Sequence, residues 1–244
     1  MYKNFLLDQK GALATITLNR SEKRNPVNEE MLQEFLDILT RLRDDPENRI
    51  IVITGSGPAF CSGADVSRLK GAATEEERLK QFDLARGKRR VYLQRALEMV
   101  DRMEQITIAA INGFAVGGGL HLALACDFRV AADTATFWYP EITLGSVVGT
   151  WQMSRLMRIV GPAKVKEMIL TGDHYTAQQL LGMGLVTKVT SRDGLLGEAN
   201  ALACKLLERK PGVLVLAKAT INALATTLVN DSASVASHQL LRSS

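Results

Sequence analysis

The sequence predicts an α/β fold, in which strands alternate with helices over the first 140 residues and helices dominate the remainder. Two apolar runs, residues 50–53 and 106–111, are typical of buried strands, and each is followed by a glycine-rich turn and a helical pattern. The chain has 244 residues, 46% hydrophobic and 23% charged, which suits a folded protein with a large core. We expect a single domain, with a core over residues 1–190 and a helical region over residues 191–244.

The chain is expected to begin with a hairpin. Residues 5–8 and 13–18 flank Gly11, and residues 15–18 alternate polar and apolar side chains with the period of a half-buried strand. A polar loop at residues 19–26 follows, and Asn28 can cap the next helix, which carries apolar side chains from Leu32 to Leu42. A second helix is expected between the capping-box pattern of Thr74 and Glu77 and about residue 103.

The second half of the chain turns from strands to helices. The strand at residues 106–111 leads to three glycines, residues 117–119, which open a small apolar helix that ends near Cys126. Residues 128–131 and 135–138 are expected to be strands. From Gly149 onward the pattern is mostly helical.

Composition excludes several classes of protein. The net charge of +4 and the pI near 9.0 suit an anionic ligand but do not indicate a nucleic-acid partner. No apolar stretch is long enough to span a bilayer, so no membrane partner is expected. No cysteine or histidine cluster indicates a metal site. The three cysteines are widely spaced and indicate a reducing, cytoplasmic location.

Two glycine-rich segments carry the strongest functional signal. The first is FCSGAD at residues 60–65, and the second is INGFAVGGGLH at residues 111–121. A strand that ends in such a turn and opens a helix presents unpaired N–H groups, which bind negative charge. Two turns brought together by neighbouring strands can hold one developing oxyanion. The alternative is a pair of tight turns that need glycine for backbone geometry alone.

These segments and several others, in the same order along the chain, resemble the crotonase superfamily, also called the enoyl-CoA hydratase/isomerase family. The resemblance covers nearly the whole chain and includes LNRSEKRN (18–25), SGAD (62–65), the glycine stretch, CD (126–127), PEITLG (140–145), LTG (170–172) and GLVTK (184–188). It implies a crotonase-like spiral of ββα units, followed by C-terminal helices that assemble a homotrimer or a dimer of trimers. Family members carry one more short segment beyond the position of Ser244, so we expect the natural chain to be longer.

The resemblance also implies an acyl-CoA thioester as substrate, whose carbonyl oxygen lies between two backbone N–H groups. By motif match these belong to Ala64 and Gly118. Coenzyme A is part of the substrate, so neither a separate cofactor nor a metal is expected. The expected substrate-binding residues are Lys23, Arg24, Ser62, Gly63, Asp65, Gly117, Trp138 and Gly149.

The acid–base residues depart from the family pattern at one position. Typical hydratases of the family use two glutamates; Glu141 matches the second, whereas the first position holds His121 at the retained spacing. A neutral imidazole can deprotonate or orient a water near pH 7, and a desolvated glutamate can hold or deliver the α-proton. The alternatives are a hydrogen-bonded core histidine and a surface turn carboxylate.

Basic residues concentrate in one window of the chain. Residues 78–95 carry a charge of +6, which outweighs that of the rest of the chain. Lys23 and Arg24 lie in a loop that, in the family, is near the adenosine phosphate of CoA, and either group of cations can bind phosphate. A solvated helix face is the alternative for the window. The cluster comprises Arg78, Lys80, Arg86, Lys88, Arg89, Arg90 and Arg95.

The leading hypothesis is an enoyl-CoA hydratase, a lyase that adds water across a 2,3 double bond through an oxyanion-stabilised enolate. An enoyl-CoA isomerase that uses Glu141 as its single acid and base is the alternative within the family. A non-catalytic member that binds CoA or RNA is the alternative from another class.

Overall fold

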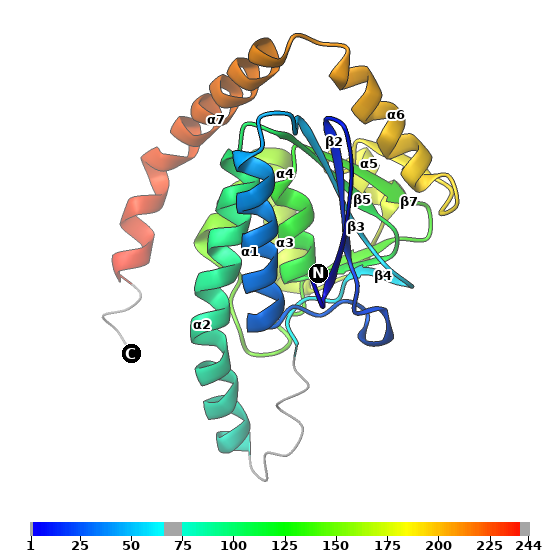
Figure 1. The fold of residues 1–244 in the computed structure, drawn as a ribbon. Helices are drawn as coiled ribbons and strands as arrows, with labels where there is room; N and C mark the ends of the chain where they lie inside the picture. The colour runs from blue at the N-terminus through cyan, green and yellow to red at the C-terminus, as the bar shows by residue number, and fades with distance from the viewer. Residues whose placement is uncertain (1, 66–74, 240–244) are drawn as a thin grey trace.

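The computed structural model describes the backbone of residues 2–65 and 75–239 and the side chains of residues 2–65 and 89–225. The chain opens with β1 (Phe5–Lys10), β2 (Leu13–Leu18), the short 3-10 helix η1 (Ser21–Lys23), α1 (Glu29–Asp44), β3 (Ile50–Gly55), β4 (Ala59–Cys61) and α2 (Glu75–Arg102). It continues through β5 (Ile106–Ile111), β6 (Phe114–Val116), α3 (Gly118–Ala125), β7 (Phe128–Ala132) and β8 (Thr136–Trp138). The last elements are α4 (Thr150–Thr171), β9 (Tyr175–Thr176), α5 (Ala177–Gly182), β10 (Lys188–Thr190), α6 (Leu195–Leu207) and α7 (Pro211–Gln239) (Figure 1).

The strands form two sheets, and successive pairs of strands contribute to both. The large sheet has the order β1-β2-β3-β5-β7-β10, and the small sheet has the order β4-β6-β8-β9. Because β3, β5 and β7 enter the large sheet while β4, β6 and β8 enter the small one, the chain winds as a spiral of ββα turns. The predicted α/β architecture is therefore confirmed.

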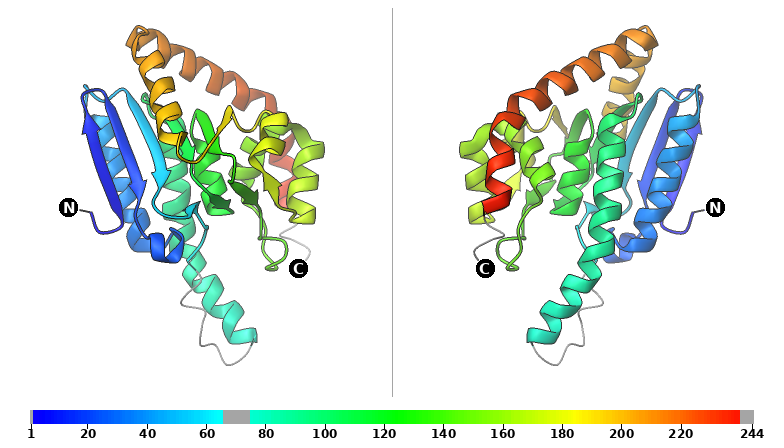
Figure 2. Two further views of the ribbon diagram at one scale, coloured as in Figure 1. Left: turned by 90° about the vertical axis from the view of Figure 1, so that its right-hand side faces the viewer. Right: turned by 90° about the vertical axis from the view of Figure 1, so that its left-hand side faces the viewer.

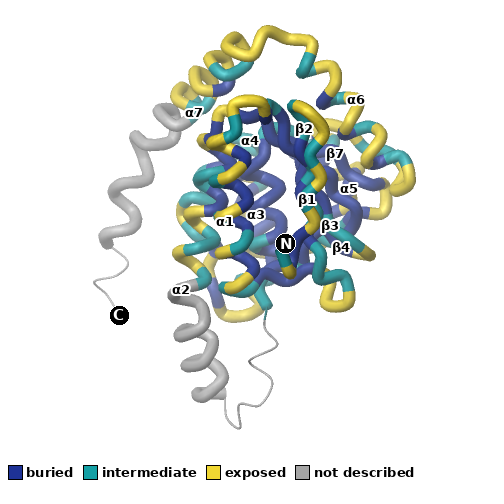
Figure 3. Tube along the Cα trace, in the orientation of Figure 1, coloured by how far each residue is buried: buried dark blue, intermediate teal, exposed yellow. Residues whose placement is uncertain are grey.

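The large sheet separates two apolar clusters. Alternate residues of β3 point to opposite faces, with Ile51 and Ile53 in one cluster and Ile50 and Val52 in the other. Helices α1, α2, α3 and α4 lie on the first side, and α6 covers the second (Figures 1 and 2). Figure 3 shows α3 and the central strands as the most enclosed part of the chain. Both faces of β3 and β5 are buried, which accounts for the nearly continuous apolar runs of these two strands.

Local sequence signals account for the element boundaries. The Asn28 side chain accepts a 2.8 Å hydrogen bond from the Met31 N–H, which confirms the predicted cap of α1. The capping box expected at Thr74 lies outside the described residues. The sequence does not predict four of the observed strands, and two of these, β9 and β10, interrupt the region after Gly149 that is expected to be helical. They are β4, β6, β9 and β10, and each has two or three residues, too few to show a period.

Helix α7 leaves the body of the molecule and arches over one end of it (Figure 1). Two of its side chains reach back to the core: Lys218 Nζ donates to Asp127 Oδ2 at 2.8 Å, and Asn222 Nδ2 donates to the Asp101 carbonyl at 3.1 Å. Within the described part of the chain, no helix combines the length and apolarity needed to cross a membrane.

Candidate active site

The two glycine-rich turns meet at one edge of the small sheet. Strands β4 and β6 pair in parallel, so their carboxyl ends lie side by side. A β-carbon built on Gly63 would lie 3.7 Å from the Gly118 nitrogen, which places the first turn in contact with the start of α3. The structure therefore brings together the two segments that the sequence singled out.

Hydrogen bonds to the segment between β2 and α1, residues 19–28 (the early loop), hold the first glycine-rich turn in place. Val27 forms a parallel bridge with Ala64: its N–H donates to the Gly63 carbonyl at 2.7 Å, and its carbonyl accepts from the Asp65 N–H at 2.9 Å. In this pattern the Ala64 N–H points away from Val27. It donates no hydrogen bond to another described residue, and Ala64 lines a cavity.

The second turn presents the N-terminus of α3 to the same cavity. Gly117 has φ 46° and ψ −111°, and its N–H donates to the Trp138 carbonyl at 3.1 Å. Gly118 is the first helical residue, so its N–H has no intrahelical partner. The positive pole of the helix and two outward N–H groups together form a site that favours an anionic oxygen.

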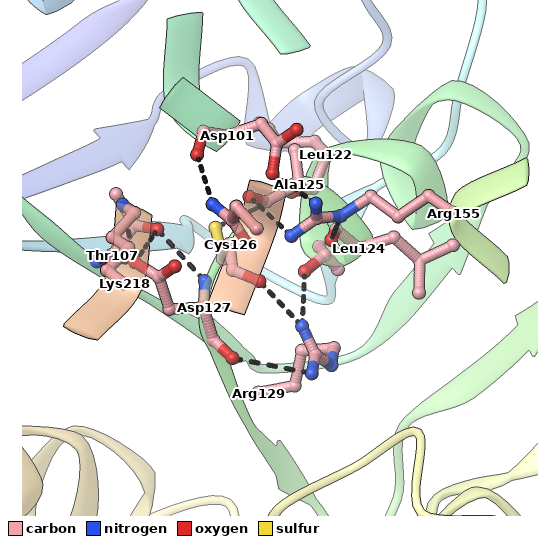
Figure 4. A network of polar contacts seen from close by, with 12 residues as sticks. Asp101, Thr107, Leu122, Leu124, Ala125, Cys126, Asp127, Arg129, Arg155 and Lys218 are labelled. Carbon is pink, nitrogen blue, oxygen red and sulfur yellow. Dashed lines mark hydrogen bonds and ion pairs between the residues drawn. The ribbon is translucent and has the colours of Figure 1, made fainter. Parts of the chain in front are cut away.

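Two buried arginines hold the other end of α3. Figure 4 shows Arg129 and Arg155 pointing at the last carbonyls of the helix. Arg129 donates to the Cys126 carbonyl at 2.7 Å, and Arg155 donates to the Leu124 carbonyl and pairs with Asp101. Cations at a helix C-terminus satisfy the orphan carbonyls and stabilise the negative pole. This short helix, apolar apart from His121, is thereby fixed with its N-terminus at the cavity.

Glu141 lies directly against the second turn. It follows β8, and its carbonyl accepts a 2.7 Å hydrogen bond from the Ser146 N–H, which closes the turn that carries it. A β-carbon at Gly117 would approach the Glu141 Oε1 to 2.7 Å. The carboxylate therefore occupies the space that the absent side chain leaves.

His121 is buried one turn into α3, with only 4% of its surface exposed. Burial lowers the pKa of the imidazole from 6.5 to about 3, so the ring is neutral at physiological pH. Its Nε2 has no hydrogen-bond partner among the described residues. The ring packs against Tyr139, with 5.3 Å between centroids.

These groups surround one cavity of about 250 Å³. Of the residues expected at the site, Ser62, Gly63, Ala64, Gly117, Gly118, His121, Glu141 and Gly149 line it. Glu141 is the sole carboxylate among the described residues of the lining. In the described part of the chain, no group of three or more potential ligands is arranged to hold a metal ion.

Four expected substrate-binding residues are not part of this lining. Asp65 pairs with Arg20 at 2.8 Å and fastens the early loop to the first turn. Trp138 packs edge-on against Phe114 and stacks on His174 at 4.2 Å, on the side of β8 opposite Tyr139. Lys23 and Arg24 are exposed at the edge of the early loop, where the Arg24 carbonyl accepts from the Ser62 N–H.

Other lining residues were not named as site residues from the sequence. Arg89 and Arg90 belong to the basic cluster and stand at the cavity, whereas the side chains of Arg78, Lys80, Arg86 and Lys88 lie outside the described residues. Their sequence signal was charge alone, which does not distinguish them from a solvated face. The remaining lining comes from Val27, Leu93, Val116, Pro140, Leu144, Ser146, Val147, Val148 and Gln152.

Comparison with known proteins identifies the family. The family model described as enoyl-CoA hydratase/isomerase matches residues 8–243. This chain belongs to the enoyl-CoA hydratase/isomerase family. It is an enzyme of the crotonase superfamily, with the crotonase fold.

Relatives and solved structures agree with this membership. The chain is 37% identical to a crotonyl-CoA hydratase of Syntrophomonas wolfei over 91% of this chain and 82% of the relative. It is 35% identical to a short-chain-enoyl-CoA hydratase of Clostridium acetobutylicum, over 90% of this chain and 81% of that protein.

Structural neighbours include both hydratases and an isomerase of the family. An enoyl-CoA hydratase from Bacillus anthracis superposes with a TM-score of 0.81 at 32% identity, covering 95% of this chain and 91% of that one. A monofunctional enoyl CoA isomerase from M. smegmatis superposes with a TM-score of 0.76 at 29% identity, covering 95% and 96%. Membership therefore does not distinguish between the two reactions.

Proposed function

We propose that the protein is an enoyl-CoA hydratase, which adds water across the 2,3 double bond of a short enoyl-CoA thioester. The observation that carries the proposal is the convergence of Ala64, Gly118, His121 and Glu141 on one cavity. Its volume of about 250 Å³ lies below the range of about 300–1,000 Å³ of most ligand pockets and suits a short acyl group. The names of the hydratase relatives support the same reaction.

In this proposal the Ala64 and Gly118 N–H groups hold the thioester carbonyl oxygen. Addition at the β-carbon moves negative charge onto that oxygen as the enolate forms. Hydrogen-bond donors that are already oriented stabilise the enolate oxygen more strongly than they stabilise the carbonyl oxygen of the ground state. The loss of one such donor raises the activation barrier by about 3–4 kcal/mol. The N-terminal pole of α3, anchored by Arg129 and Arg155, adds to the stabilisation.

Glu141 transfers the proton. Its carboxylate takes one proton from water as the water oxygen bonds to the β-carbon, and it gives that proton to the α-carbon as the enolate collapses. The β-carbon thus gains the hydroxyl group of the water, the α-carbon gains its proton, and the carboxylate is restored. One group can serve both steps because neither step needs a second carboxylate.

His121 orients the water. With a pKa of about 3 the imidazole is too weak a base to take a proton from water, which argues against the deprotonating role among the sequence-based expectations. A neutral ring still offers one donor and one acceptor. It can fix the direction of a water without changing its own charge.

The phosphates of CoA are proposed to contact basic residues of the cavity lining and of the early loop. Arg89 and Arg90 stand at the cavity, and Lys23 and Arg24 lie on the loop that is hydrogen-bonded to the first turn. Charge-assisted hydrogen bonds to phosphate position the acyl group at a distance from the chemistry. Trp138 and Asp65 would then act by shaping and fastening this region.

We also propose a homotrimer or a dimer of trimers. Helix α7 exposes large apolar side chains that a monomer leaves in water, namely Val213, Leu216, Ile221 and Leu224. Sedimentation of the full chain tests this: a single species at the monomer mass would contradict it.

Mass spectrometry tests the reaction. A panel of acyl-CoA thioesters is incubated with the protein in water enriched in oxygen-18, and the masses of the products are measured. A 2-enoyl-CoA that gains one water carrying the heavy oxygen supports the hydratase. The isomerase is the second candidate because one carboxylate suffices for a proton shuttle. Interconversion of 3-enoyl and 2-enoyl thioesters with no uptake of water would support the isomerase and overturn the hydratase.

A further inference from the structure

We propose that Tyr139 is a positioning residue for His121: its hydroxyl donates to Nε2 of the imidazole when substrate binds, and so holds the neutral ring in the tautomer protonated at Nδ1. The role of the imidazole in orienting water rests on the proposed function, whereas the contact between the two side chains does not depend on it.

Tyr139 lies behind the site rather than in it. It follows β8 two residues before Glu141, is only 1% exposed, and does not line the cavity. Its ring lies against the imidazole of His121, with centroids 5.3 Å apart and planes inclined by 34°. His121 in turn lines the cavity, so Tyr139 contacts a lining side chain without lining the cavity itself.

Both side chains keep a buried polar atom without a partner. Among the described residues, neither the Tyr139 hydroxyl nor His121 Nε2 has a hydrogen-bond partner. A buried hydroxyl without a partner costs folding free energy, and phenylalanine would fill the same space without that cost. Core packing therefore does not explain the hydroxyl.

The hydroxyl remains a donor under all physiological conditions. Burial, together with the negative charge of Glu141, raises the pKa of Tyr139 well above 10. Nε2 of a neutral imidazole can accept from it, whereas an N–H at that position cannot. Hydrogen bonds of catalytic groups are often long in unliganded enzymes and tighten in the substrate complex, so a small rotation or one bridging water completes this contact.

The tautomer decides what the ring offers to a water. The proton of a neutral imidazole sits on the nitrogen opposite the one that accepts, so a donor at Nε2 leaves the N–H at Nδ1. With its tautomer fixed, His121 can hold the water oxygen by donation while Glu141 receives the water proton. A ring that exchanged between tautomers would hold the water in this way only part of the time.

The test is Tyr139→Phe, with Tyr175→Phe as the matched control. Tyr175 is another buried tyrosine, 4% exposed, on β9 outside the cavity. The chain has three histidines, so nitrogen-15 NMR of labelled histidine resolves the ring of His121. We expect the wild-type ring to be protonated at Nδ1 in the complex with a non-reacting acyl-CoA, and Tyr139→Phe to shift its nitrogen resonances.

Stability and kinetics separate positioning from packing. Tyr139→Phe is expected to raise the melting temperature by about 2–4 °C and to lower kcat at least about 10-fold at unchanged KM. Tyr175→Phe should leave the His121 resonances and kcat unchanged. A wild-type ring protonated at Nε2, unchanged His121 resonances in Tyr139→Phe, or a parallel loss of stability and activity would overturn the proposal. If the wild type hydrated no enoyl-CoA while the resonances shifted as expected, the proposed function would fail and the tautomer assignment would stand.

Discussion

The carboxylate of Glu141 is seated against Gly117 so closely that a β-carbon on the glycine would come within 2.7 Å of Oε1. Gly117 also has a φ of 46° and a ψ of −111°, a conformation that residues with side chains rarely adopt. One glycine thus meets two needs, because it makes room for the carboxylate and it permits the turn that opens α3.

Gly117→Ala should therefore damage the site on both counts. The methyl group displaces Glu141 and strains the turn that presents the Gly118 N–H, so we expect kcat to fall at least about 100-fold, together with a lower melting temperature. Gly197→Ala is the control, since no atom lies within 4 Å of a β-carbon there and the residue is helical. It should stabilise the fold by about 0.5–1 kcal/mol and leave kcat unchanged. Full activity in Gly117→Ala would refute the seating of Glu141.

Burial of His121 makes stability depend on pH. Its pKa is about 3 in the folded chain against an ordinary 6.5, so between these values the unfolded chain binds a proton that the folded chain does not. Stability is therefore complete above about pH 6.5 and falls as the pH drops, by up to about 1.4 kcal/mol per pH unit from this group. Urea unfolding from pH 6.5 to 4.5 should show a steeper loss for the wild type than for His121→Gln. Parallel curves would contradict the burial of a neutral ring.

Arg155 should contribute strongly to stability. Its guanidinium caps α3 and pairs with Asp101, and both side chains are nearly buried. Arg155→Ala leaves the carboxylate without its partner and the helix carbonyls uncapped, which should cost about 3–5 kcal/mol of unfolding free energy. Lys3→Ala, which removes an exposed pair with Glu30, should cost about 1 kcal/mol or less. Similar losses in the two variants would show that the cap does not anchor α3.

Arg90 should act on substrate affinity rather than on the chemical step. It lines the cavity from α2, whereas His121 lies on α3 and Glu141 follows β8. We expect Arg90→Ala to raise KM about fivefold at low salt, the equivalent of about 1 kcal/mol, with kcat unchanged. Arg95→Ala, an exposed residue of the same helix outside the lining, should leave KM unchanged. An equal rise in KM in both variants would indicate a diffuse electrostatic attraction instead of a direct contact between Arg90 and the substrate.

Most of the fold follows from local patterns in the sequence. The alternation within residues 13–18 and the apolar run of residues 106–111 predict β2 and β5 with their observed bounds, because each segment has six residues, enough to show its pattern. Strands of two or three residues, such as β9, owe their conformation to a partner that is distant in the chain. No local signal predicts them.

The site is predictable where it depends on the backbone and much less so where it depends on side-chain direction. The two glycine-rich segments predict the turns that meet, and the resemblance to the family assigns Ala64 and Gly118 within them. By contrast, Trp138 at the end of β8 and Tyr139 just after it point in opposite directions, so Trp138 stacks on His174 and Tyr139 packs against His121. Which face meets the site becomes evident only once both sheets are in place.

The central claim is that Glu141 moves the proton while His121 stays neutral, and hydration of crotonyl-CoA by Glu141→Gln tests it most directly. The amide retains the size of the side chain and cannot take up the proton of water. We expect kcat to fall by about 10²–10⁴, with KM and the melting temperature close to those of the wild type. A kcat within twofold of the wild-type value would contradict the claim.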